Sequence, residues 1–487
     1  MRWLLGLLLL LGSQVSLLAP ANAAVTPITI PGGPTSATEP VPVSLEADLY
    51  LPDQTPAPAV IVAHGFGGSK ASVAQDATYL VERGFAVLTY SARGFGASSG
   101  QISMNSPEFE VADASRIIDY LADLDGIVQD APGDPRVGIA GGSYGGALAL
   151  LAAGYDPRVD AVAADITWNN LERSLFGQSV IGSKSVGVYK ELWAGLFFSS
   201  GLEQTSGEVN TCGRFTPAWC TAYSEAASRG VVEPESRELM WASSPVSITD
   251  RITAPTLLGG GQSDSLFPLS ETDANAEQIR TAHPEVPVKV VWHAGGHDGG
   301  ISETDRLQSL TADWFNAYLR DGSPVPLTFE VSTVERSAFS DRAAGEVSVY
   351  SAPEYPGVFA TTPLTIKLET ETQQILAPAG GVPAAVSSLP GLGALSGAAG
   401  AFLNFPLPNQ SALFTSQPLD ASTSIVGSPR VRLSVSSDTP RSDVTLFVNL
   451  RILGGTGIPE VPKGLVAPVR LNSIGPQPTT VEVALPT

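Results

Sequence analysis

The stretch that decides the fold is Gly141-Gly142-Ser143-Tyr144-Gly145-Gly146. An apolar run, 137–140, precedes it, and a run of good helix formers, 147–153, follows it. This order is strand, tight turn and helix, with G-x-S-x-G in the turn. A serine hydroxyl is a poor nucleophile unless it is exposed beside a base, and a strained strand-to-helix turn exposes it. Ser143 is therefore the candidate nucleophile; the alternative is a surface Gly/Ser turn before an ordinary helix.

The segments around this turn alternate between expected strands and helices. Continuous apolar runs predict buried strands, and helical spacing of apolar residues predicts helices. Glycine-rich turns at the strand ends complete the pattern of a parallel sheet with helices on both faces, an α/β fold. The expected strands are 45–50, 59–63, 86–90, 137–140, 159–166, 256–258 and 288–292, and the expected helices are 73–83, 110–124 and 304–319. Residues 24–44 are Pro/Thr-rich and are expected to form an extended arm.

Three segments outside this rhythm define the expected domain organisation. Residues 168–245 lack a clear strand and are rich in Trp, Phe and Leu, so we expect a helical cap inserted into an α/β-hydrolase domain that spans 41–325. Helical periodicity disappears beyond the linker 321–324, and residues 326–487 are expected to form an all-β, jelly-roll-like sandwich. Its expected strands are 327–331, 346–350, 364–368, 412–414, 431–435, 444–450 and 480–484, with a mobile Gly/Ala/Pro/Ser-rich loop at 377–401.

Composition and the N-terminus bear on location and partners. The chain has 487 residues, 43% of them hydrophobic, and a net charge of −21, which argues against nucleic-acid and anionic-membrane partners. Arg2, the apolar run 4–11 and the small-x-small sequence at 21–23 predict a signal peptide over residues 1–23, cleaved near Ala23. The apolar run is too short to span a bilayer. We therefore expect a secreted or periplasmic/cell-envelope protein.

The two cysteines, Cys212 and Cys220, lie eight positions apart. In an oxidising compartment they predict a local disulfide, with two unpaired buried thiols as the alternative. Two cysteines and four scattered histidines are too few to indicate a metal centre, so neither a metal nor a cofactor is expected.

A serine hydrolase on such a sheet needs an acid and then a histidine after the serine, each at a strand end. The strand 256–258 leads into Asp264, and the strand 288–292 leads into His297. His297 would accept the proton of Ser143, and Asp264 would fix the tautomer of the imidazole and stabilise its charged form. Asp298 is a weaker candidate acid, because a neighbour in sequence would struggle to turn back onto the His297 ring.

Glycine-rich loops supply the candidate oxyanion donors. The backbone N–H of Tyr144, at the start of the expected helix, and that of Phe66, in the loop after strand 59–63, are expected to face the developing negative charge. We expect His64 to order that loop without transferring protons, and we expect Arg93 to pair with a buried acid such as Asp113. His283 and His293 receive no chemical role.

Together these motifs resemble the family of X-Pro dipeptidyl-peptidases and cocaine-esterase-like acyl hydrolases. The matching features are the 141–146 turn, the Ala-Arg-Gly-Phe-Gly-x-Ser-x-Gly turn at 92–100, the helical insertion after the strand that ends at Ile166, and the appended β-sandwich. The resemblance implies a serine hydrolase. Cocaine-esterase-like members use a tyrosine hydroxyl in the oxyanion loop, where this chain has Phe66, so a backbone donor is implied here. The large N-terminal helical domain of X-Pro dipeptidyl-peptidases is not seen, and the early end of the sandwich suggests a fragment.

The leading hypothesis is an exported serine hydrolase that cleaves ester or amide acyl bonds through an acyl-enzyme, acting on a small-molecule ester or a peptide. Release of a dipeptide requires an anionic subsite for the substrate ammonium, for which Glu191, Glu203 and Glu208 are candidates, although acidic residues in such a segment are usually solvated surface. We favour an esterase slightly over a dipeptidyl-peptidase. The alternatives are a non-catalytic extracellular binding protein and an acyltransferase that uses the same serine. Nothing in the sequence predicts the oligomeric state or the physiological substrate.

Overall fold

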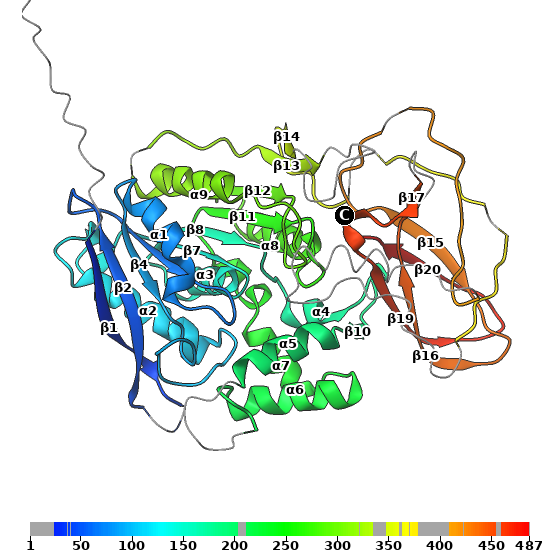
Figure 1. The fold of residues 1–487 in the computed structure, drawn as a ribbon, viewed down its shortest axis with the longest axis horizontal. Helices are drawn as coiled ribbons and strands as arrows, with labels where there is room; N and C mark the ends of the chain where they lie inside the picture. Colours follow the sequence, from blue (N-terminus) through cyan, green and yellow to red (C-terminus); the bar gives the residue numbers. More distant parts are fainter. Residues whose placement is uncertain are drawn as a thin grey trace, which may run out of the picture.

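The computed structural model describes residues 24–486 except 37, 39, 203–210, 321, 335–346, 360–362, 370, 378–408, 422 and 454–458. Its centre is a ten-stranded sheet in the order β1-β2-β4-β3-β7-β8-β11-β12-β13-β14. In Figure 1 helices flank this sheet, and a second, strand-rich part that includes the C-terminus lies beside it. The expected signal peptide, 1–23, and nearly all of the expected mobile loop lie outside the described residues.

The middle of the sheet consists of parallel strands whose side chains are almost all buried. These strands are β3 (Ala59–Ala63), β4 (Ala86–Tyr90), β7 (Val137–Gly142), β8 (Val159–Asp165), β11 (Thr256–Gly261) and β12 (Val288–His293). The apolar runs predicted each of them, because a strand covered on both faces has no polar side to show in its sequence. Their carboxyl ends meet at one edge of the sheet, which is where the candidate site lies.

At one side the sheet ends in an antiparallel pair, β1 (Ala24–Pro34) and β2 (Pro42–Leu51). The expected extended arm is therefore an edge strand. Pro27 and Pro31 are tolerated there because β1 pairs with a neighbour on one side only.

Helices cover both faces of the sheet, as the alternating pattern predicts. The helices α1 (Ala74–Val81) and α9 (Thr304–Leu319) pack on one face, against Val60 and Val62 among others. The other face is covered by α2 (Ala112–Ala122), α3 (Tyr144–Tyr155) and α8 (Leu269–Ala282), which pack against Ile61 and its neighbours. A short β5–β6 hairpin (Gln129–Ala131, Asp134–Pro135) precedes β7.

The segment between β8 and β11 is largely helical. It contains α4 (Leu171–Leu175), α5 (Glu191–Gly201), α6 (Pro217–Arg229) and α7 (Pro234–Ala242), with the short strands β9 (Phe176–Gly177) and β10 (Val188–Tyr189). We call residues 168–245 the cap. The structure joins Cys212 to Cys220, in the first turn of α6, by a disulfide whose Cα atoms are 5.3 Å apart.

Beyond α9 the structure differs from the sequence-based expectation. The strands expected to begin the β-sandwich near residue 326 extend the main sheet instead: β13 (Phe329–Val334) runs parallel to β12, and β14 (Val347–Ala352) pairs antiparallel with β13. The physical reason is an apolar contact with β12. The Phe329 ring packs edge-on against Trp292 of β12, with centroids 4.9 Å apart.

The rest of the C-terminal part is built mainly from strands, as expected. Strand β15 (Arg430–Val435) pairs with β20 (Thr479–Ala484), β16 (Arg441–Val448) pairs with β19 (Ala467–Ile474), and β17 (Ile452–Leu453) pairs with β18 (Pro459–Glu460). The predicted strands 364–368 and 412–414 are wrong: the residues that the structure describes in this region contribute a single bridge, between Leu368 and Ser416. Leu364 is 59% exposed, so the apolar residues there do not face a packed layer that would hold a strand.

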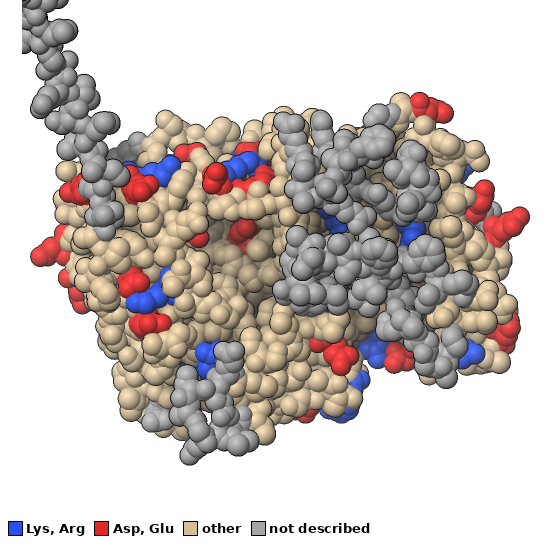
Figure 2. Space-filling view, viewed as in Figure 1, with Lys and Arg blue, Asp and Glu red and all other residues tan. Residues whose placement is uncertain are grey.

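Charged groups of both signs share the visible surface. On the face drawn in Figure 2, Lys and Arg side chains lie next to Asp and Glu side chains at several places, over a mostly uncharged surface. None of the helices in the described part of the chain has the length and apolar character that a bilayer crossing requires.

Candidate active site

Ser143 lies at the turn between β7 and α3, in a strained conformation with φ 56° and ψ −118°. Its own backbone contacts hold it there. Its N–H donates to the carbonyl oxygen of Asp165 at 2.9 Å, and its carbonyl oxygen accepts from the Thr167 hydroxyl at 2.7 Å. A strained backbone of this kind persists only where several surrounding contacts hold it in place. The strained turn exposes the Ser143 side chain at the end of the strand.

The turn also requires glycine. A Cβ atom on Gly145 would lie 2.2 Å from the carbonyl oxygen of Ala63, because α3 leaves the turn directly over the end of β3. A Cβ on Gly141 would lie 2.5 Å from the backbone of Gly145. Close backbone approach therefore requires glycine at positions 141 and 145.

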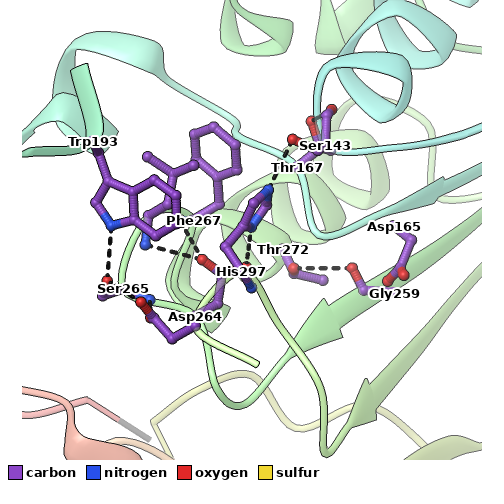
Figure 3. A network of polar contacts seen from close by, with 12 residues as sticks. Ser143, Asp165, Thr167, Trp193, Gly259, Asp264, Ser265, Phe267, Thr272 and His297 are labelled. Atoms are coloured by element: carbon purple, nitrogen blue, oxygen red, sulfur yellow. Dashed lines mark hydrogen bonds and ion pairs between the residues drawn. The ribbon is translucent and has the colours of Figure 1, made fainter. Parts of the chain in front are cut away.

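The structure brings Ser143, His297 and Asp264 together, although they lie far apart in the chain. His297 follows β12 and Asp264 follows β11, at the same sheet edge as Ser143 (Figure 3). The Nε2 atom of His297 lies 2.8 Å from the Ser143 hydroxyl oxygen, and its Nδ1 atom lies 2.6 Å from Oδ2 of Asp264. Hydroxyl, imidazole and carboxylate thus form one continuous hydrogen-bonded chain.

The Asp264 carboxylate is fully buried and fully partnered. Its Oδ1 accepts from the backbone N–H groups of Leu266 and Phe267 at 3.0 and 2.7 Å, while its Oδ2 also accepts from the His297 N–H at 3.2 Å. Four hydrogen-bond donors around one carboxylate fix its orientation. Asp264 is therefore held with Oδ2 toward the His297 ring.

Two opposing effects set the pKa of His297. Burial disfavours the charged imidazolium, but the Asp264 carboxylate and its hydrogen bond outweigh burial and raise the pKa above its ordinary value. The rings of Trp193, on α5, and Phe267 meet the imidazole edge-on at centroid distances of 5.9 and 5.2 Å. They limit how far the His297 ring can tilt.

The loop after β3 lies beside the nucleophile. A Cβ on Gly65 would come within 3.9 Å of the Ser143 Cβ, so this loop and the N-terminus of α3 border the same space. The Phe66 ring packs among the rings of Phe95, Tyr144, Phe197 and Phe215, with centroids 5.0 to 6.0 Å away. This packing holds the Phe66 side chain beside that of Tyr144. The roles of the Phe66 and Tyr144 N–H groups as oxyanion donors stay predictions.

His64 has the structural role that the sequence indicates. Its Nε2 accepts from the Ala92 N–H at 3.0 Å, and its Nδ1 donates to the carbonyl oxygen of Gly65 at 2.7 Å. Burial lowers the pKa of His64, which favours this neutral form. The ring orders the loop and faces no reacting group.

The other charged candidates are engaged elsewhere. The carboxylate of Asp298 accepts from the N–H and the hydroxyl of Ser265. It therefore holds the loop after β11 that carries Asp264, which we call the acid loop, and it is Asp264 that bonds the His297 ring. The predicted Arg93–Asp113 pair is confirmed: the guanidinium donates two hydrogen bonds of 2.7 Å to the carboxylate, with both side chains buried.

A second histidine–carboxylate pair at this edge was missed. Nε2 of His293, at the end of β12, lies 2.9 Å from Oδ1 of Asp165, at the end of β8. Burial opposes the charged form of each group, but each partner outweighs burial, so the pKa of His293 is raised and that of Asp165 is lowered. The sequence did offer a signal for this pair: Asp165 is a carboxylate at the end of the buried strand β8, which lies next to the strand that leads to Ser143.

A buried carboxylate also lies below the turn. Glu110 accepts from the Tyr144 hydroxyl at 3.2 Å and from the N–H groups of Ser103 and Ser106 at 2.6 and 3.0 Å. Burial raises the pKa of Glu110 to about 7. This contact fixes the side chain of Tyr144, the residue that follows the nucleophile. No local pattern in the sequence predicted the contact.

Comparisons with known proteins agree with this architecture. Residues 42–299 match the family model described as X-Pro dipeptidyl-peptidase (S15 family), and residues 327–468 match the X-Pro dipeptidyl-peptidase C-terminal non-catalytic domain. The crystal structure of an aminopeptidase from the marine sediment archaeon Thaumarchaeota archaeon shares the fold, with a TM-score of 0.64 over 98% of this chain and 88% of that chain at 14% identity.

Among curated proteins the matches are partial. A dipeptidyl aminopeptidase BIII from Pseudoxanthomonas mexicana is 25% identical over 293 residues, 59% of this chain and 37% of the relative. An uncharacterized protein, PA2218, from Pseudomonas aeruginosa is 31% identical over 132 residues, 26% of this chain and 34% of the relative. The chain thus matches about a third of the length of these relatives. Since the first family model alone covers more than half of the sequence, the chain belongs to the X-Pro dipeptidyl-peptidase (S15) family.

Proposed function

We propose that the chain is a serine hydrolase that cleaves an ester or amide acyl bond with Ser143, His297 and Asp264. The observation that carries the proposal is the continuous chain of hydrogen bonds from the Ser143 hydroxyl through the His297 imidazole to the buried Asp264 carboxylate. Neither a binding module nor a structural domain needs a strained serine at this position.

The chemistry follows from the positions of the atoms. His297 Nε2 accepts the proton as Ser143 Oγ attacks the acyl carbon, and Asp264 stabilises the imidazolium that forms. The N–H groups of Tyr144 and Phe66 would stabilise the oxyanion. The imidazolium then protonates the leaving alcohol or amine, which departs and leaves an acyl-serine. A water molecule, activated by the neutral imidazole, hydrolyses this intermediate and restores the Ser143 hydroxyl.

Within this class we propose an acyl ester as the preferred substrate. Aromatic side chains lie near the site: Phe197 and Phe215 pack on Phe66, in the loop beside Ser143, and Trp193 and Phe267 contact the His297 imidazole. Such a surface suits an apolar acyl group. Of the carboxylates suggested for a peptide ammonium, Glu191 is exposed at the start of α5, and Glu203 and Glu208 lie outside the described residues.

A fluorophosphonate probe tests the chemistry directly. The wild-type protein is expected to be labelled and the Ser143→Ala variant is not, with a Ser98→Ala variant as the control for a serine outside the turn. Absence of labelling in folded wild-type protein would refute the proposed function.

The substrate preference needs a separate comparison. We expect kcat/KM for p-nitrophenyl acetate to exceed that for Ala-Pro-p-nitroanilide. The reverse order would assign the site to dipeptide release.

We also propose that the protein is exported, on the basis of the basic, apolar and small-residue pattern in residues 1–23. Expression of the full chain in a bacterial host followed by mass spectrometry of the extracytoplasmic fraction tests this. The expected mature N-terminus is Ala24; an intact N-terminus retained in the cytoplasm would contradict export.

A further inference from the structure

The cap makes a charged contact with the loop that carries Asp264. Lys190 directly precedes α5, and its ammonium donates to the carbonyl oxygens of Ser265 and Leu266 at 2.6 and 2.9 Å. These two partners follow Asp264 directly in the chain. A cation that binds two successive backbone carbonyls restricts the turn in which they lie.

The same turn orients the Asp264 carboxylate. Two successive peptide groups connect Lys190 to Asp264. In the 265–266 group the Ser265 carbonyl oxygen accepts from Lys190 and the Leu266 N–H donates to Oδ1 of Asp264. In the 266–267 group the Leu266 carbonyl oxygen accepts from Lys190 and the Phe267 N–H donates to the same Oδ1. A hydrogen bond on one side of a peptide group polarises the group and strengthens the hydrogen bond on its other side. Lys190 therefore acts on Asp264 through one intervening turn.

A second residue of the cap reaches the same loop. The indole N–H of Trp193, one turn further along α5, donates to the Ser265 hydroxyl at 3.1 Å (Figure 3). That hydroxyl donates to Asp298 at 3.0 Å. The Trp193 ring also meets the His297 ring edge-on. The start of α5 is thus attached to both the acid loop and the imidazole.

We propose that Lys190 is a positioning residue for the reaction, which holds the 265–267 turn so that Asp264 stays aligned with His297 and thereby couples the cap to the catalytic groups. This inference rests on the proposed function, because it assigns a role in the same reaction. Lys190 touches none of the reacting atoms.

The charges around Lys190 make its contact dependent on pH. It faces the carboxylates of Glu271 on α8, of Asp264 in the acid loop and of Asp298 beside His297. Burial outweighs these three charges and lowers the pKa of Lys190 to about 8. A neutral amine binds carbonyl oxygens more weakly than an ammonium, so alignment weakens as the pH rises through this value.

Replacement of Lys190 tests the role with p-nitrophenyl acetate as the substrate. Lys190→Met is expected to lower kcat by about 10–100-fold, the loss that small misplacement of catalytic groups produces, with KM within about twofold of the wild-type value. Lys190→Arg, which keeps the charge, is expected to recover most of kcat and to move the alkaline limb of the kcat profile to higher pH. Lys184→Met, at an exposed position of the same segment, is the matched control and should change nothing.

A second measurement does not depend on turnover. The proton between His297 Nδ1 and Asp264 should give a far-downfield proton NMR signal in the wild type that is lost or broadened in Lys190→Met and kept in Lys184→Met. An unchanged signal, or a kcat for folded Lys190→Met within twofold of wild type, would overturn the inference. If the wild type has no activity, the proposed function fails and the NMR comparison alone decides whether Lys190 positions the pair.

Discussion

His297 must be neutral to accept the proton of Ser143, so its pKa sets the acidic limb of the pH profile. The Asp264 carboxylate raises that pKa above 6.5, against the opposing effect of burial. A raised pKa keeps the imidazole charged, and therefore inactive as a base, to a higher pH. We expect kcat/KM to rise with pH through a midpoint above about 6.5. Asp264→Asn should shift the limb downward and reduce kcat by about 10⁴-fold; a wild-type midpoint below 6.5 would contradict the assignment.

Residues could be predicted from the sequence where topology determines their place. Ser143, Asp264 and His297 each follow a buried strand, and the carboxyl ends of parallel strands meet at one edge whatever the intervening loops do. Lys190 could not be found in this way. Its partners lie 75 and 76 positions away in a loop, and the segment that carries it has no periodicity to fix its direction.

At the scale of elements, α3 crosses over the end of β3. This crossing predicts that Gly145 and Gly142, two glycines of the same motif, differ in how well they tolerate a Cβ atom. A Cβ on Gly145 would meet the Ala63 carbonyl oxygen at 2.2 Å, and backbone cannot move aside cheaply. A Cβ on Gly142 has its nearest neighbour, the Asp165 carbonyl oxygen, at 3.9 Å, an ordinary contact. Gly145→Ala should lower the free energy of unfolding by about 1–3 kcal/mol, the usual cost of overpacking, whereas Gly142→Ala should fold as stably as wild type. Equal stability in chemical denaturation would show that α3 can shift.

Helices and strands were predicted best where the pattern of apolar residues in their own sequence shows which of their faces are buried. The buried strands and α9 appear at the predicted positions because a continuous apolar run and a helical stripe each describe what covers the element. The neighbour with which a strand pairs could not be predicted in this way. Strands β13 and β14 were recognised approximately as strands but assigned to the wrong sheet, because an alternating pattern does not say which free edge the strand will meet.

At the scale of the molecule, the C-terminal part is attached to the cap by main-chain hydrogen bonds. Ser179 exchanges contacts with both pairs of strands: its N–H donates to the Pro468 carbonyl oxygen at 2.8 Å, and its own carbonyl oxygen accepts from Ala484 at 2.9 Å. The N–H of Ile181 donates to the main-chain carbonyl oxygen of Glu482 at 2.9 Å. The C-terminal part therefore supports the segment that leads to Lys190 and α5.

Arg470 is the side chain that tests this attachment. On β19, its guanidinium donates to the carbonyl oxygens of Gly187 and Gly230 in the cap at 3.2 and 3.4 Å, while Asp443 holds it from the other side at 2.6 Å. Arg470→Met removes the donors and leaves cap carbonyls without these partners, which typically costs about 1–3 kcal/mol. We expect a lower melting temperature, faster limited proteolysis within the cap and a reduced kcat, because the cap can then move relative to the acid loop. Arg432→Met, at an exposed position on β15, is the matched control. If both variants are cleaved at the wild-type rate, the C-terminal part does not support the cap through Arg470.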